Sequence, residues 1–282
     1  MPDTSPSAIP TGTVRALSFH SEALQADWNY IVYEPPGYET GALRYPACYL
    51  LHGNFGAPRD YIDAGDLPAT ADRLIAEGKT RPAVIAMPDG GQSWYLNHEA
   101  TRMEDAILGE FIPHIEKTER VIASRAARRI GGISMGGYGS LRYALKRPEL
   151  FAAVALMSPA IYADLPHEGS SAWHGAPFCA PRPAGGPVFV PAAWHAQAYP
   201  TMIDACPPGP QPKFYIESGA QDEYGIADEA RRLHEAFISR GRESTFGLRP
   251  GTHDWTTWKA ALETALPFLL GDAPAPTPVE TA

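Results

Sequence analysis

Ser134 has the strongest chemical signature in this chain, because it lies in the pattern Gly-x-Ser-x-Gly between Gly132 and Gly136. In this pattern the serine stands on a very tight turn between a strand and a helix, which exposes its hydroxyl at the end of the sheet. Larger side chains at the two glycine positions would collide within the turn. The apolar run RRIGGI precedes the serine and the helical pattern GGYGSLRYALKR follows it, as the motif requires. This context favours a nucleophile over a glycine-rich turn with an incidental serine.

His253 is the expected base. A serine hydroxyl needs a general base, and the base needs a carboxylate that orients it. Chains with this turn carry these groups in the order serine, acid, histidine, and His253 follows the last predicted strand and opens the final helix. The other histidines precede the serine, lie inside an amphipathic helix or fall in an irregular loop (His20, His52, His98 and His114; His234; His167, His174 and His195). The order favours catalysis over a structural role for His253.

Asp222 is predicted to be the orienting acid. It lies in the segment GAQDEY, just beyond the strand KFYIES, and functional residues gather at the carboxyl ends of parallel strands. Glu223 is the nearest rival, and Glu217 falls within the strand itself. As a plain loop residue, Asp222 would only cap the helix that begins near Ala227.

Two backbone N–H groups are needed to stabilise the negative oxygen that develops during acyl transfer. The residue after the nucleophile, Met135, is expected to supply one of them. The second is assigned to Asn54 in the segment LLHGNFG, which follows an early strand. Neighbouring N–H groups of this loop are alternatives, and so is the interpretation of His-Gly as an ordinary turn at the end of a strand.

The elements that must position these groups alternate between strands and helices. Strands are expected at residues 13–18, 27–33, 47–51, 83–87, 129–134, 151–157, 213–218 and 244–248, and helices at 101–120, 135–146, 227–240 and 255–269. This alternation predicts an α/β fold, a mostly parallel sheet with helices on both faces and an antiparallel edge formed by the first two strands. One domain is expected over residues 13–270, between disordered segments at 1–12 and 271–282.

Residues 164–212 break the alternation, with many prolines and glycines and the tryptophans Trp173 and Trp194. Long irregular loops in compact domains are usually lids, binding loops or disordered segments. Because this segment follows a core strand, we expect a cap over the site rather than a variable surface insertion. Its two tryptophans are then candidates for substrate binding.

Composition excludes several classes of function. The 282 residues carry a net charge of −9, and no run of lysine and arginine is present, which argues against nucleic-acid binding. No stretch approaches the ~18 apolar residues of a membrane span, and the first residues lack a signal-peptide pattern, so a cytoplasmic protein is expected. Cys48, Cys179 and Cys206 form no metal-binding pattern, and pairing of the last two is disfavoured. Homo-oligomerisation is left open.

Five segments together resemble a known family. LLHGNFG, PDGGQSWY, GGISMGGYGSL, GAQDEY and GTHDW are similar to the putative-esterase family, which includes esterase D, S-formylglutathione hydrolases, tributyrin and feruloyl esterases and mycolyltransferases. The resemblance spans residues 14 to 270 approximately and implies the α/β-hydrolase fold. It places nucleophile, acid and base at Ser134, Asp222 and His253, and the oxyanion donors at Met135 and Asn54. S-formylglutathione hydrolases tend to carry a cysteine in the loop where this chain has Asn54-Phe55, which weakens that interpretation. The form GISMGGYG is more similar to that of the tributyrin and feruloyl esterases.

Within the same resemblance, the segment 92–95 with Trp94 and Tyr95 is similar to a wall of the acyl or alcohol pocket, although these two residues could instead only pack the core. Phe55 is a further candidate for substrate binding. The expected function is a serine carboxylesterase that acts on short-chain acyl or feruloyl esters through an acyl-serine, with a small-molecule substrate and no cofactor or metal. The alternatives are a thioesterase similar to S-formylglutathione hydrolase, an acyltransferase, and a non-catalytic binding protein with the same fold.

Overall fold

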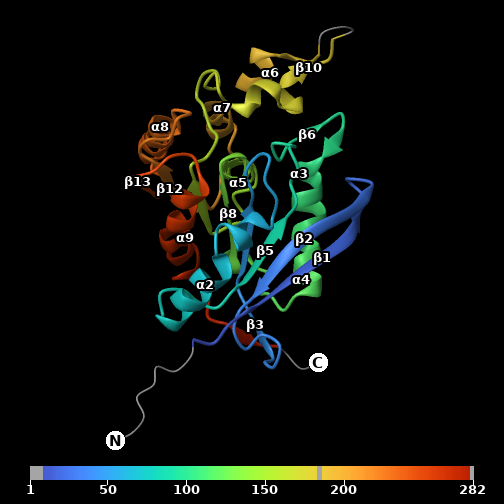
Figure 1. Cartoon of the computed structure of the whole chain (residues 1–282), viewed down its shortest axis with the longest axis vertical. Coiled ribbons are helices and arrows are strands. Elements are labelled where there is room, and N and C mark those ends of the chain that lie inside the picture. The colour runs from blue at the N-terminus through green and yellow to red at the C-terminus, as the bar shows by residue number, and fades with distance from the viewer. Residues whose placement is uncertain (1–8, 183–185, 280–282) are drawn as a thin grey trace, which may run out of the picture.

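One eight-stranded sheet forms the centre of the molecule (Figure 1). The computed structural model describes residues 9–182 and 186–279. The strand order is β1-β2-β5-β4-β8-β9-β12-β13. The bounds are β1 Thr13–Ser21, β2 Ala26–Glu34, β4 Ala47–Leu51, β5 Val84–Pro88, β8 Arg128–Ile133, β9 Ala153–Met157, β12 Lys213–Gly219 and β13 Ser244–Arg249. The pairs β1–β2 and β2–β5 are antiparallel and all others are parallel, which confirms the predicted sheet and its antiparallel edge.

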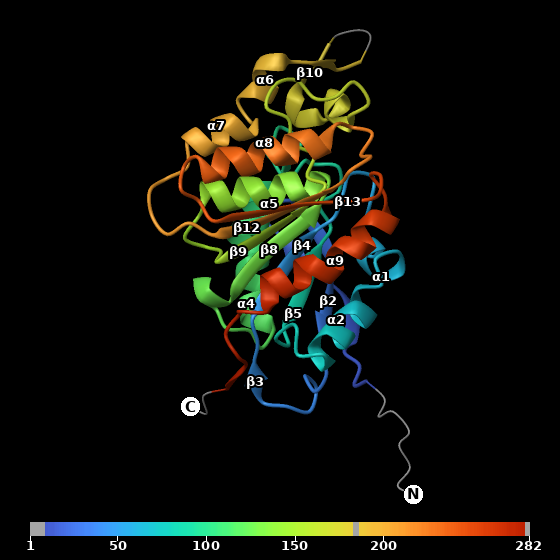
Figure 2. The same cartoon turned by 90° about the vertical axis from the view of Figure 1, so that its left-hand side faces the viewer.

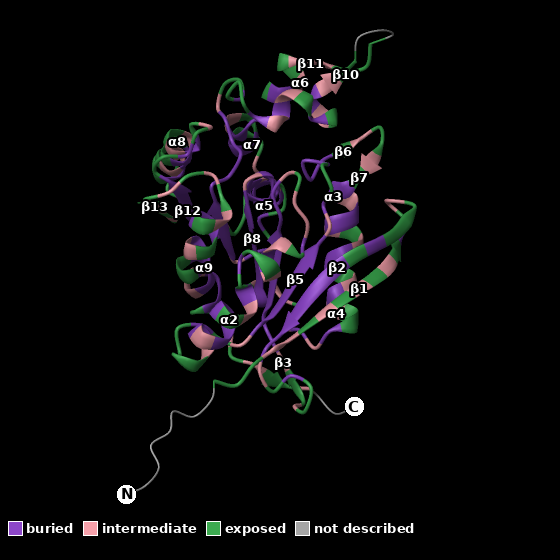
Figure 3. Ribbon diagram, in the orientation of Figure 1, coloured by how far each residue is buried: buried purple, intermediate pink, exposed green. Residues whose placement is uncertain are grey.

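Helices cover both faces of the sheet because the central strands are apolar on both faces. In β4, Cys48 and Leu50 belong to one apolar cluster, and Tyr49 and Leu51 belong to the other. This period of two is the pleat of a strand that is buried on both faces. One face is covered by α2 (Leu67–Ala76) and α9 (Trp255–Leu270), and the other by α5 (Met135–Lys146), α8 (Ile226–Ile238) and α4 (Ile112–Thr118) (Figure 2). The burial colours of Figure 3 show the same arrangement, with the central strands buried between these layers.

The helix expected at residues 101–120 is interrupted. It consists of α3 (Met103–Asp105), a π-helical turn (Ala106–Phe111) and α4, and the N–H of Ile112 donates to the carbonyl of Ile107. Pro113 follows immediately and has no N–H to donate, so the regular ladder cannot pass through this position. The wider turn accommodates this defect.

The segments outside the sheet differ from the expectations in part. The tail predicted to be disordered from Gly271 contains β14 (Thr277–Pro278), which pairs with β3 (Leu43–Arg44). That prediction was wrong for these residues, because the partner strand is distant in sequence. The described part of the N-terminal segment includes Gly12, whose N–H donates to Asp72 at 2.9 Å, and residues 1–8 lie outside the described residues. A short helix, α1 (Asp60–Asp63), and α2 were not expected.

The insertion at residues 164–212 lies at the end of the molecule where the labels α6 and β10 stand (Figure 1). Its described parts form two 3-10 turns (Ser171–His174 and Ala176–Phe178), the short strands β10 (Cys179–Ala180) and β11 (Val188–Phe189), and the helices α6 (Pro191–His195) and α7 (Tyr199–Asp204). Cys48, Cys179 and Cys206 are free cysteines. Among the helices of residues 9–182 and 186–279, none combines the length and the apolar character needed to cross a membrane.

Candidate active site

Ser134 occupies a strained turn between β8 and α5. Its φ of 52° lies in the left-handed region, which residues with a side chain rarely adopt. The flanking glycines leave room for this turn. A Cβ on Gly132 would approach the carbonyl oxygen of Leu51 to 2.7 Å, and one on Gly136 would approach that of His52 to 2.7 Å. The two glycines therefore let the turn pack directly against the end of β4.

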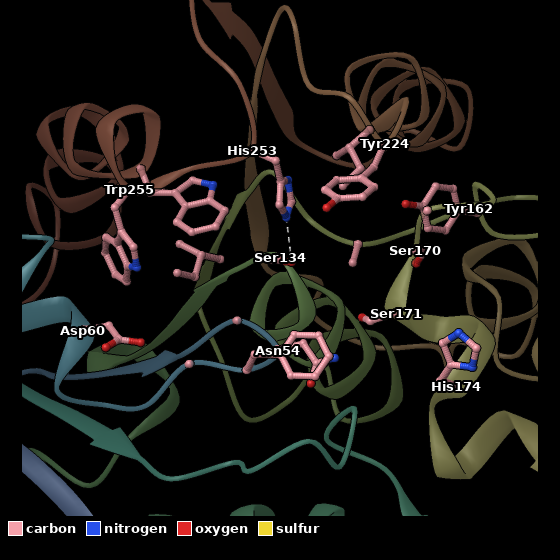
Figure 4. A pocket seen from close by; sticks show the side chains of 18 of the residues that line it. Asn54, Asp60, Ser134, Tyr162, Ser170, Ser171, His174, Tyr224, His253 and Trp255 are labelled. Carbon is pink, nitrogen blue, oxygen red and sulfur yellow. Dashed lines mark hydrogen bonds between the residues drawn. The ribbon is translucent and has the colours of Figure 1, made fainter. Parts of the chain in front are cut away.

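Ser134, His253 and Asp222 form a continuous chain of hydrogen bonds (Figure 4 shows the first link). His253 Nε2 lies 2.9 Å from Ser134 Oγ, and its Nδ1 lies 2.7 Å from Asp222 Oδ2. The rings of Tyr224 and Trp258 meet the imidazole edge-on, each with centroids 5.0 Å away, and hold its plane. The structure thus brings together three residues that the sequence separates widely. This geometry can transfer the serine proton to a histidine that a carboxylate orients.

The structure separates Asp222 from its rival Glu223. The side chain of Asp222 is fully buried and accepts a second hydrogen bond from the N–H of Tyr224 at 3.1 Å. Glu223 instead accepts the backbone N–H of His253 at 3.1 Å and does not touch the imidazole nitrogens. Glu217, the third carboxylate considered, is buried within β12 and pairs with Arg249.

The loop after β4 is fixed by His52, a residue whose role the sequence did not reveal. His52 is fully buried, and its Nε2 accepts the N–H of Gly90 at 2.8 Å. Its Nδ1 therefore carries the proton and donates to the carbonyl of Gly53 at 2.8 Å. Because a trans peptide points its N–H away from its carbonyl, this bond sets the direction of the Asn54 N–H.

Gly53 and Asn54 border the serine on one side. A Cβ on Gly53 would lie 3.4 Å from the Cβ of Ser134, so the loop passes close to the nucleophile. Met135 opens α5, and the first N–H groups of a helix have no partner within it. Both expected oxyanion donors thus lie beside Ser134.

A pocket of about 450 Å³ opens above Ser134. Its walls come from the loop after β4 with the start of α1, from α9 and from the insertion (Gly53, Asn54, Phe55 and Gly56 with Asp60; Trp255 and Trp258; Glu168, Gly169, Ser170, Ser171 and His174). Ile133, Ser134, Ala160, Tyr162, Tyr224, Ile226 and His253 lie between them. The first part of the insertion therefore borders the site, as a cap would.

Of the five aromatic residues expected at the pocket, only Phe55 lines it, with 77% of its surface exposed. The prediction was wrong for Trp94 and Tyr95. Both have positive φ angles and are fully buried in the core, where Trp94 packs against Tyr138 and Tyr95 against Tyr143. The Tyr95 hydroxyl donates to the carbonyl of His52 at 3.1 Å, so it supports the loop from behind.

The two tryptophans of the insertion are also not lining residues. Trp194 is fully buried, and Trp173 packs against Phe189 with its N–H donated to the carbonyl of His167. Trp194 contacts the rings of Trp94 and Phe178 at centroid distances of 6.1 and 4.8 Å. This cluster anchors the insertion to the core.

Replacing Trp194 with alanine is expected to lower the free energy of unfolding by about 3–5 kcal/mol, because a large buried ring leaves a cavity that the core cannot close. It also removes a hydrogen bond of 2.7 Å to the carbonyl of Asp164. Urea denaturation followed by circular dichroism measures the loss. Trp173→Ala, in the same insertion but half-buried, is the matched control, and equal losses in the two variants would contradict the anchoring role of Trp194.

Several lining residues were missed by sequence reasoning. Asp60, Tyr162, Tyr224 and the hydroxyls of Ser170 and Ser171 are ordinary loop residues in the sequence, and no pattern marks them. Trp255 and Trp258 could have been found, because they follow His253 at the start of the final helix, in HDWTTW.

Comparison with known proteins identifies the family of the chain. The model of the family described as "Putative esterase" matches residues 21–269, nearly the whole described chain. The chain belongs to the putative-esterase family. The chain is also similar to an endo-1,4-beta-xylanase/feruloyl esterase from Xylanibacter ruminicola, 30% identical over 163 residues, which cover 55% of this chain and 22% of that protein. An acetyl esterase from Caldicellulosiruptor saccharolyticus is 27% identical over 78% of this chain and 82% of its own length.

Solved structures show the same fold. A ferulic acid esterase superimposes with a TM-score of 0.77 at 24% identity, over 93% of this chain and 99% of that chain. The α/β-hydrolase fold is thereby confirmed. The chain spans 22% and 26% of the length of the first curated relatives, which are much longer proteins.

Proposed function

We propose that this chain is a serine carboxylic ester hydrolase that acts through an acyl-serine intermediate. The observation that carries this proposal is the hydrogen-bonded chain from Asp222 through His253 to Ser134, at 2.7 and 2.9 Å, at the floor of an open pocket. Membership of the putative-esterase family and the names of relatives that are feruloyl and acetyl esterases support the same conclusion.

In the proposed reaction, His253 removes the proton of Ser134 as the serine oxygen attacks the ester carbonyl carbon. The protonated imidazole then gives that proton to the leaving alcohol, and an acyl-serine is left. Water attacks the acyl-serine with His253 again as base, which releases the acid and restores the serine. Asp222 keeps Nδ1 as the donor, so that Nε2 faces Ser134 as the acceptor throughout.

The N–H groups of Asn54 and Met135 are proposed to stabilise the oxyanion of the two tetrahedral intermediates. Preorganised donors of this kind typically contribute about 10²- to 10³-fold to kcat each. His52 contributes indirectly, because its buried hydrogen bond to the Gly53 carbonyl holds the peptide that carries the Asn54 N–H.

The preferred substrates are esters of small acyl groups or of aromatic acids such as feruloyl. A pocket of about 450 Å³ accepts either, and the aromatic residues Trp255 and Phe55 offer apolar surface to an aromatic acid. Thioester hydrolysis and acyl transfer use the same acyl-serine, so comparison of products with water and with added alcohol separates them. A cytoplasmic location and self-association remain predictions from the sequence.

A fluorophosphonate probe tests the proposal, because it reacts only with an activated serine. We expect one probe molecule to attach to Ser134, as located by mass spectrometry of the modified peptide. The labelled protein is expected to lose hydrolysis of p-nitrophenyl acetate. An unlabelled Ser134 under conditions that label a reference esterase would overturn the proposal in favour of a non-catalytic binding protein.

A further inference from the structure

The two ends of the pocket differ in their chemistry. Figure 4 shows Asp60 and Trp255 on one side of Ser134, and Tyr162 and Ser170 on the other. The second end presents hydroxyl groups, whereas the first presents the carboxylate of Asp60 and the indole of Trp255. The lining holds one further carboxylate, Glu168, which lies two residues before Ser170 in the chain.

We propose that Asp60 and Trp255 form a subsite that binds a positively charged, ammonium-like group of the ligand and disfavours a negatively charged one. This ammonium subsite rests on the proposed function, because it would select among the esters that reach Ser134. The charge of Asp60 and the indole of Trp255 at the same end of the pocket provide the attraction.

The negative charge of Asp60 is not balanced within the described pocket. Asp60 Oδ2 accepts the N–H of Ala57 at 2.8 Å, and none of the ion pairs among the described residues includes Asp60. The described residues that line the pocket include no lysine or arginine, and Glu168 adds a second carboxylate.

The nearest basic residues along the chain are engaged elsewhere. Arg59, next to Asp60, pairs with Asp63 at 3.2 Å, and Lys259, one turn beyond Trp255, pairs with Asp66 at 3.0 Å. Two like-charged carboxylates without a cation make a concave surface attractive to positive charge, since fields are focused in clefts.

The indole of Trp255 at this end is held in place. Tyr61 meets the Trp255 indole edge-on, with centroids 5.4 Å apart at 85°. A Cβ on Gly65 would approach the same indole to 2.8 Å, so the ring packs directly on this glycine. The face of an aromatic ring attracts a cation and repels an anion, which adds to the effect of Asp60.

Inhibition by small alcohols of equal shape tests the subsite. Choline and 3,3-dimethylbutan-1-ol differ by one charge, and 2-hydroxyethanesulfonate carries the opposite charge. We expect choline to inhibit p-nitrophenyl acetate hydrolysis with an inhibition constant about fivefold lower than that of the neutral alcohol, and the sulfonate to be weaker than both. The preference is expected to shrink at high salt, because the subsite is partly open to solvent.

Asp60→Asn removes the charge and keeps an oxygen that can accept the Ala57 N–H, so the fold is expected to persist. In this variant most of the preference for choline over the neutral alcohol should be lost, and the Trp255 ring and Glu168 account for what remains. Asp228→Asn is the matched control for the loss of one negative charge, because Asp228 is exposed at the start of α8, belongs to none of the ion pairs among the described residues and does not line the pocket. It should retain the preference for choline.

Direct titration of choline, followed by tryptophan fluorescence, separates this inference from the proposed function. An enzyme without esterase activity that still binds choline through Asp60 would overturn the function and leave the subsite standing. Equal affinity for choline and the neutral alcohol in the unmodified protein would overturn the subsite. Tighter binding of a neutral sugar such as methyl xyloside than of choline, if it depended on Asp60, would also overturn the subsite. The carboxylate would then be a site for hydroxyl groups.

Discussion

Replacement of Ser134 by alanine is expected to lower kcat for p-nitrophenyl acetate by about 10⁴- to 10⁶-fold, because removal of the nucleophile disables the whole hydrogen-bonded unit at once. The residual rate would come from substrate binding and from the oxyanion donors alone. Steady-state kinetics with active-site titration of the unmodified enzyme gives the comparison.

The substitution is conservative for the fold. Alanine keeps the Cβ that the turn already accommodates at a φ of 52°, and the backbone N–H of residue 134 keeps its bond to the Met157 carbonyl at 3.0 Å. Unchanged circular dichroism and thermal midpoint are therefore expected. A variant that keeps more than a few per cent of the original kcat would show that another residue is the nucleophile.

The residues that carry the proposed chemistry were visible in the sequence because each lies in a short local pattern. Ser134 needs the glycines on either side of it, and Asp222 and His253 each follow directly on a strand of the sheet. Neighbouring parallel strands end at the same edge, so β8, β12 and β13 had to deliver these residues to one place. The order of the motifs along the chain was therefore enough to predict that Ser134, Asp222 and His253 lie together.

The walls of the pocket were not visible in the same way. In the sequence, Trp94 and Trp194 look like substrate residues because both are aromatic residues of expected loops. In the structure Trp94 has a positive φ angle, and tertiary packing buries both side chains. Asp60 looks like a plain loop acid. The pairing of β14 with β3 depends on contacts across more than two hundred residues, which no local pattern encodes.

The contrast between Asp222 and Glu223 shows what the structure adds. The sequence left both carboxylates as candidates at adjacent positions. The structure directs one to the imidazole and the other to the backbone N–H of the same histidine. The pair therefore holds His253 at two points, but only Asp222 acts on the protonation of the ring.

Asp222→Asn is expected to lower kcat by about 10³- to 10⁴-fold. The asparagine amide can donate to His253 Nδ1, which would move the ring proton to Nε2 and leave no acceptor for the Ser134 proton. A hydrogen bond would still join residue 222 to His253 Nδ1, which lie 2.7 Å apart in the unmodified protein, but its donor and acceptor would be exchanged. Kinetics with p-nitrophenyl acetate measure the loss, and a fluorophosphonate probe is expected to label the variant much more slowly than the unmodified enzyme.

Glu223→Gln is the matched control for this prediction. It removes a charge from the adjacent position, and its amide oxygen can still accept the His253 backbone N–H, which lies 3.1 Å from Glu223 in the unmodified protein. A change of no more than a few-fold in kcat is expected, because the imidazole keeps its buried partner. Both variants preserve a hydrogen bond to His253, and only Asp222→Asn changes the tautomer of its ring. A loss in Glu223→Gln as large as that in Asp222→Asn would therefore contradict the prediction. It would mean that the position of His253, and not the location of its ring proton, limits the reaction.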